Sequence, residues 1–150
     1  MTKEFLEILK KELISLNKSM ILFHESYERC SVIGDKANYS STELEMFEAL
    51  TARYARLSDL LIQKIFRLID SLELVDEGTL VDRINRAEKR GIIKSAKEFT
   101  NLRLLRNTIV HEYEPDEYTR IFKDVLKMAP ILLDSVDKTK QYCQKLLHRG

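Results

Sequence analysis

The sequence has 150 residues, with only 4 Gly and 2 Pro to form turns. This length is enough for a single domain, residues 1–150, with a core that needs no disulfide or metal to hold it. The formal net charge of +1 excludes a whole-chain attraction to nucleic acid or to an anionic membrane. Any nucleic-acid contact must therefore depend on a local cluster of basic residues.

The chain carries no sign of a membrane or secretory destination. No stretch approaches the roughly 18 uncharged apolar residues of a membrane helix, and the N-terminus lacks the apolar centre of a signal peptide. We therefore expect a cytoplasmic protein in which Cys30 and Cys143 are reduced thiols.

Apolar residues recur at three- and four-residue spacings, which predicts amphipathic helices. The first helix is predicted from Thr2 to about Cys30, and residues 31–40 are rich in turn formers and predict a loop. Either Ser41 or Thr42 could cap the second helix. We prefer Thr42, because Glu45 three residues later would complete a capping box.

The second helix is predicted to continue to Leu72. Its later part, around Leu60, Leu61 and Ile62, is apolar on more than one face. This pattern indicates burial on two sides, either in the centre of a bundle or at a dimer interface.

A short third helix is predicted after Gly78, which breaks the second. Thr79 is its expected N-cap, and it should run to about Arg90. Gly91 then provides the left-handed residue that commonly ends a helix.

Two more helices complete the chain. Ser95 is the expected cap of the fourth, which should end near residues 111–113 because the residue before Pro115 is disfavoured in the helical conformation. The fifth should run from Pro115 to Leu147, with Pro130 as a candidate kink. Long helices joined by short loops predict an all-α antiparallel bundle of about five helices.

Residues 106–113, Arg-Asn-Thr-Ile-Val-His-Glu-Tyr, close the predicted fourth helix and are the best candidates for chemistry. Asn107 and His111 are four residues apart and share a helix face. Arg106 and His111 are separated by roughly 140° around a regular helix. The two side chains can reach one phosphate only if their length spans this angle, if the last helical turn is loosened, or if one of them comes from a second subunit.

This segment, with Leu105 before it, resembles the Arg-x4-His-x-Tyr signature of HEPN ribonuclease toxins of the HepT branch, which pair with a nucleotidyltransferase antitoxin of the MNT type. The chain length and the order of five helices agree with the resemblance, whereas outside the motif only the pattern matches. The resemblance implies a metal-independent endoribonuclease without a cofactor, active as a homodimer with both motifs at a shared cleft. It also implies that the antitoxin adenylylates Tyr113.

The residue types suit RNA cleavage, in which the 2′-OH attacks the adjacent phosphate. His111 can transfer protons near neutral pH, and Arg106 can bind phosphate oxygens and stabilise the transition state. Asn107 can orient the imidazole or bind phosphate. Nucleotides added to Tyr113 would repel RNA and block the cleft.

Local charge agrees with an RNA substrate, for which tRNA is a candidate. Residues 83–106 hold eight basic and two acidic side chains, a net charge of +6 in a near-neutral chain. Four of these basic residues are our candidates for binding the RNA backbone: Arg90, Lys94, Lys97 and Arg103.

Each of these features also has a structural interpretation. Arg106 alone would suggest a surface salt bridge to a glutamate, His111 an interaction with the helix dipole, and Tyr113 packing against the bundle. The basic segment could equally be a solvated face. The sequence leaves open whether Arg53, Arg56 or Asp59 completes the cleft.

Two other functions remain open. The chain could be a non-catalytic HEPN partner, the substrate-binding subunit of a nucleotidyltransferase. It could also be an unrelated helical dimer in which Arg-x4-His is coincidental. No metal site is expected, because the histidines and cysteines lack chelating spacings on one helix.

Overall fold

The computed structural model describes residues 3–75, 77–111, 114 and 117–149, and every regular element in these ranges is a helix. The backbone stays helical from α2 through η1 into α3, so these three segments form one long helix. The described residues therefore confirm the predicted all-α bundle of five helices. The bounds are α1 (Lys3–Ile33), α2 (Ser41–Asp59), η1 (Leu60–Ile65), α3 (Phe66–Leu72), α4 (Leu80–Lys89), α5 (Ala96–His111) and α6 (Tyr118–Arg149).

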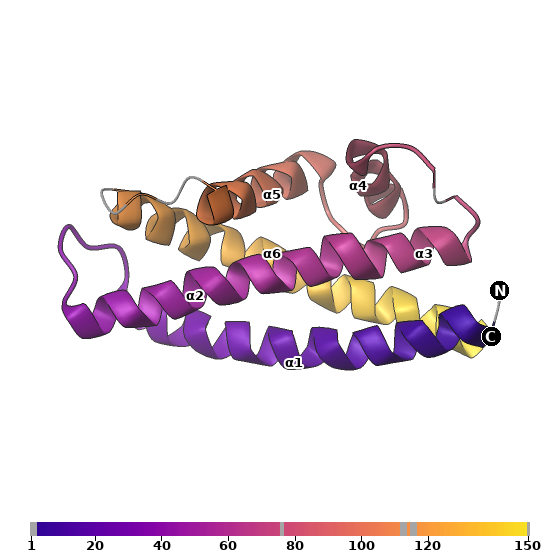
Figure 1. Ribbon diagram of the computed structural model, residues 1–150, viewed down its shortest axis with the longest axis horizontal. Coiled ribbons are helices and arrows are strands. Elements are labelled where there is room, and N and C mark those ends of the chain that lie inside the picture. The colour runs from indigo at the N-terminus through magenta and orange to yellow at the C-terminus, as the bar shows by residue number, and fades with distance from the viewer. Residues whose placement is uncertain (1–2, 76, 112–113, 115–116, 150) are drawn as a thin grey trace.

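Three long rods form the body of the bundle: α1, the α2–η1–α3 helix and α6 (Figure 1). The shorter α4 and α5 cover the side of the bundle opposite α1. α1 packs on α2 and α6, while α5 packs on α2, α4 and α6. This arrangement places the end of α5, where the motif lies, against α2 and α6.

The buried side chains of all these helices form one hydrophobic cluster. Within it, the hydroxyl of fully buried Tyr54 on α2 donates a hydrogen bond to the carbonyl of Leu102 on α5, at 2.8 Å. Burial raises the pKa of Tyr54, so the phenol remains a donor. The bond fixes α5 against α2 one turn before the motif begins.

The middle of the long helix is a π-helix, η1, that the sequence pattern did not predict. The backbone N–H of Phe66 bonds to the carbonyl of Leu61, five residues back, so the turn is wider than an α-turn. Leu61 and Ile62 are both buried, in agreement with the predicted burial on more than one face. The wide turn follows directly after Asp59, the last residue of α2.

The prediction that Thr42 caps the second helix is wrong, and so is its alternative, Ser41. Ser40 is the N-cap: its hydroxyl accepts from the N–H of Glu43 at 3.1 Å, and the Glu43 carboxylate accepts from the N–H of Ser40 at 2.9 Å. Lys36 also binds the carboxylate of Glu43, at 2.9 Å. These bonds, from the Ser40 backbone first, lower the pKa of Glu43. The earlier cap is favoured because one glutamate serves both the helix end and the preceding loop.

We expect Ser40→Ala to lower the free energy of unfolding by about 1 kcal/mol, because the first turn loses the acceptor for the Glu43 N–H. Thr42→Ala is the matched control and should change stability by less than about 0.5 kcal/mol. Urea unfolding followed by circular dichroism measures both. A larger loss for Thr42→Ala than for Ser40→Ala would contradict the assignment.

The other predicted helix ends are confirmed where they are described. Thr79 caps α4 with Asp82 as its capping-box partner, and Gly91 adopts a left-handed φ of +76°. The hydroxyl of Ser95 accepts from the N–H of Glu98 at 3.2 Å. The predicted starts at Thr2 and Pro115 lie outside the described residues.

Two further observations complete the fold. α6 continues as a helix through Pro130. None of the described helices is long and apolar enough to cross a membrane.

Candidate functional site

The last two turns of α5 carry three of the four residues singled out from the motif. Arg106 and Asn107 are partly buried, whereas His111, the last described residue of α5, is exposed. The fourth, Tyr113, lies outside the described residues. The end of α5 is held in place by Leu105, which is buried in the core, and by the bond from Tyr54 one turn earlier.

Arg106 makes a two-pronged ion pair with Asp59, at the end of α2. Its Nε lies 2.6 Å from Oδ1 and its Nη2 lies 2.8 Å from Oδ2. The hydrogen bonds that Arg106 donates to Asp59 raise the pKa of Arg106. Both side chains remain partly exposed, at 24% and 38%. The pair therefore joins α5 to the start of the π-turn and fixes the plane of the guanidinium.

Asn107 extends this pair into a group of three. The Nη1 of Arg106 donates to the Oδ1 of Asn107 at 3.2 Å. A guanidinium has five N–H donors; three are used here, and two, one each on Nη1 and Nη2, have no partner among the described residues. The arrangement can still offer a pair of donors to an anion.

His111 is not joined to this group. Among the described residues it makes no hydrogen bond or ion pair, and it follows Asn107 by one helical turn. A single chain therefore brings Arg106 and Asn107 together and leaves the imidazole separate, as the helical angle between positions 106 and 111 implies.

Of the four candidates for RNA binding, Arg103 lies nearest to the motif. It is partly buried, and it precedes Asn107 by four residues and His111 by eight, so the three share a strip of α5. Lys97 lies in the first turn of this helix, about 20 Å along its axis from His111 at 1.5 Å per residue, and Lys94 lies in the bend before the helix begins.

Arg90 has a different environment. Its side chain is 11% exposed, with Nη1 2.5 Å from Oδ1 of Asp70 and Nε 3.5 Å from Glu73. Arg86 also binds Asp70, at 2.9 Å, and the Nε of Arg83 lies 3.8 Å from it. Three of the eight basic residues of the +6 segment thus surround one carboxylate that is 1% exposed, and Arg106 pairs with Asp59. The segment does not present eight charges on one surface.

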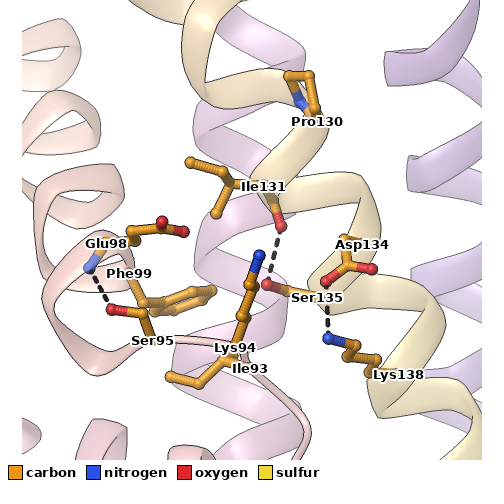
Figure 2. Close-up of a pocket in the computed structure, with 10 residues that line it drawn as sticks. All are labelled: Ile93, Lys94, Ser95, Glu98, Phe99, Pro130, Ile131, Asp134, Ser135 and Lys138. Atoms are coloured by element: carbon orange, nitrogen blue, oxygen red, sulfur yellow. Dashed lines mark hydrogen bonds and ion pairs between the residues drawn. The ribbon is translucent and has the colours of Figure 1, made fainter.

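A groove runs between α5 and α6 beside the motif. Figure 2 shows its first hollow, of about 420 Å³, where Lys94 extends towards Ser135 on α6 and Lys138 pairs with Asp134 at 3.1 Å. The second hollow, of about 620 Å³, shares Glu98 with the first and reaches Thr108. The charged residues that line the two hollows are balanced, four basic against four acidic: Lys94, Arg120, Lys127, Lys138, Glu98, Glu117, Asp124 and Asp134.

The second-helix residues left open by the sequence have distinct roles. Asp59 completes the Arg106 group. Arg53 instead bonds to the carbonyl of Leu22 and the hydroxyl of Ser26 on α1, at 2.9 and 2.8 Å. Arg56 is exposed. Of the three, only Asp59 is bonded to a residue of the motif.

Other chemistry-bearing residues of the described chain lie apart from the motif. Cys30 and Cys143 are free and buried, and burial raises their pKa values to about 11 and about 12. No group of three or more His, Cys, Asp or Glu side chains in the described ranges could hold a metal ion.

Comparisons with known proteins identify no relative: no family model matches the chain, and no curated protein or solved structure is significantly similar to it. The site is therefore interpreted from its own geometry and from the motif.

Proposed function

We propose that the chain is a HEPN endoribonuclease of the HepT type, a metal-independent toxin neutralised by a nucleotidyltransferase antitoxin that adenylylates Tyr113. One observation carries the proposal: in an all-α bundle, Arg106 and Asn107 are hydrogen-bonded to each other at the end of α5, one turn before an exposed His111. We place this activity in the cytoplasm, with RNA as substrate and tRNA as the first candidate.

In the proposed reaction the 2′-OH of a ribose attacks the adjacent phosphorus and the bond to the 5′ oxygen of the next nucleotide breaks. One proton leaves the 2′-OH and one reaches the departing oxygen, so the products are a 2′,3′-cyclic phosphate and a free 5′-OH. His111 transfers a proton. The two free donors of Arg106 bind the phosphate oxygens as charge develops on them.

A homodimer would complete this site, because His111 of one chain lies apart from its own Arg106. The outward side of α5 supports such pairing. Leu104, two residues before the motif, is 54% exposed, and Val110, within the motif, is 48% exposed. Covering them with a second copy would bring two motifs together across a two-fold axis.

The proposal is tested with purified protein and end-labelled total tRNA in EDTA. We expect cleavage products that end in a 2′,3′-cyclic phosphate. Mass spectrometry should first establish that Tyr113 is unmodified, because adenylylated protein is expected to be inactive. No cleavage by folded, unmodified protein would contradict the proposal for tRNA.

A second function is favoured by the ion pair between Arg106 and Asp59. The pair occupies the edge of the guanidinium that could otherwise bind a phosphate in two-pronged fashion. This suits a non-catalytic HEPN partner of a nucleotidyltransferase, in which Arg106 only holds α5 to α2. A neighbouring nucleotidyltransferase gene would support both functions and argue against an unrelated helical dimer.

The contribution of this ion pair to the free energy of unfolding can be measured with a double-mutant cycle. We expect Arg106→Ala and Asp59→Ala to be non-additive, with a coupling energy of about 1 kcal/mol for a partly exposed, two-pronged pair. Urea unfolding of the two single variants and the double variant gives this value. Additive losses would show that the two side chains do not interact in solution.

A further inference from the structure

A second groove is lined by α1 and α6, and α1 lies on the opposite side of the bundle from α5 (Figure 1). The groove is a hollow of about 520 Å³. Leu13, Ile14 and Leu147 give it an apolar floor, and Lys140 donates to the Oδ1 of Asn17 across it at 2.9 Å. It shares no lining residue with the groove beside the motif.

One large apolar side chain of the groove lining is exposed, and a second follows it on the same helix. Ile14, which lines the groove, is 59% exposed, and Ile21, seven residues further along α1 and outside the lining, is 46% exposed. The core stripe of the same helix is fully buried at Leu9, Leu16 and Phe23, so the two isoleucines are additional to what the fold needs. Single exposed apolar residues are common. Two that are seven residues apart on one helix, one of them lining a groove, indicate a surface that a binding partner covers.

The charged residues that line the groove are all basic: Lys10, Lys18 and Lys140. Lys10 pairs with Glu7 at 3.2 Å, and Lys140 bonds to Asn17. Lys18 makes no ion pair with any described residue. The rim is therefore cationic, although the chain as a whole is nearly neutral.

We propose that this groove docks an amphipathic helix with acidic flanks, supplied by a partner protein. A channel between two long helices accepts a third helix laid along it, with apolar residues at i, i+4 and i+7 on the floor. Acidic flanks would match the lysines on the rim. The docking surface stands independently of the proposed ribonuclease activity.

Two other occupants fit less well. A second copy placed across a two-fold axis would set the same patch against itself, with lysine facing lysine. An anionic membrane would match the charge, but it covers convex helix faces, and the apolar floor here is hollowed.

The test uses two synthetic peptides of about 18 residues, long enough to be helical. They share one leucine stripe and differ only in their flanks, which are glutamate in one and lysine in the other. By fluorescence anisotropy we expect the glutamate peptide to bind the full-length protein at least tenfold more tightly. High salt should reduce the difference.

Variants then locate the binding. Ile14→Asp should weaken binding of the glutamate peptide at least tenfold, and Lys18→Glu should narrow its advantage over the lysine peptide at least threefold. Val32→Asp is the matched control: it alters an apolar residue of α1 that is 89% exposed and outside the groove, and it should have no effect. All three sites are exposed, so the variants should remain folded by circular dichroism.

Several outcomes would overturn the proposal. Equal affinity for both peptides, no binding of either, or binding that Ile14→Asp leaves unchanged would each do so. Self-association by light scattering that Ile14→Asp abolishes would assign the groove to a second copy. Sedimentation with phosphatidylserine vesicles, lost in the same variant, would assign it to a membrane.

Discussion

We expect His111→Ala to reduce the rate of tRNA cleavage by about 10²- to 10⁴-fold, the usual contribution of a general acid–base residue. The reaction moves two protons, and His111 is the titratable side chain at the end of α5 that no described residue engages. Because the side chain is exposed, its removal should leave the free energy of unfolding within about 0.5 kcal/mol of wild type. A large loss of rate without a loss of stability is what a chemical role predicts.

His24→Ala is the matched control. His24 is also an exposed helical histidine, paired with Glu28 at 3.3 Å, and it lies on α1, across the bundle from α5 (Figure 1). Its removal should leave cleavage unchanged. If His111→Ala cleaves as fast as wild type, the activity belongs to another residue or to a contaminating nuclease, and the non-catalytic function becomes the one to pursue.

The helices were largely predictable because their signals are local. Apolar spacing, Gly78 and Gly91 mark elements within one or two turns of themselves, and the structure confirms them. The cap of α2 was mispredicted because several hydroxyls precede that helix. Ser40 and Glu43 have the same capping-box spacing as Thr42 and Glu45, so this pattern alone does not choose between the two caps, and the ion pair of Glu43 with Lys36 favours the earlier one. The π-turn after Asp59 was not predicted, because the spacing of apolar residues was compared only with the 3.6-residue period of an α-helix.

The site was predictable only in part, because its contacts join distant positions. Asp59 and Arg106 are far apart in sequence, and nothing local separates Asp59 from Arg53 or Arg56 on the same helix. The basic segment was misleading for a related reason. A count of charged residues does not show which way each side chain points. Arg90 points towards a buried carboxylate instead of solvent. One signal was present: Asp70 is an isolated acid beside Ile69, in an apolar stretch.

We expect Asp70→Ala to lower the free energy of unfolding by about 3–5 kcal/mol, the usual cost of removing one partner from a buried ion pair. Asp70 is 1% exposed and holds Arg86 and Arg90 of the α4 region against α3. The Nε atoms of Arg83 and Arg86 are buried without a hydrogen-bond partner among the described residues. The cluster therefore has no second acceptor at these atoms that could replace Asp70. Removing its anion leaves several guanidinium groups confined together.

Asp134→Ala is the control for this change. It removes an aspartate that pairs with Lys138 but is 51% exposed, so urea unfolding should show a loss of about 0.5 kcal/mol or less. Asp70→Asn preserves the shape and one of the two acceptor oxygens that Arg86 and Arg90 use while removing the charge, and provides a measurable variant if the alanine protein does not fold. A loss for Asp70→Asn no larger than that for Asp134→Ala would show that the arginines are solvated. In that case all three would become available to an RNA backbone, and the footprint of the +6 segment would widen from the end of α5 to α4.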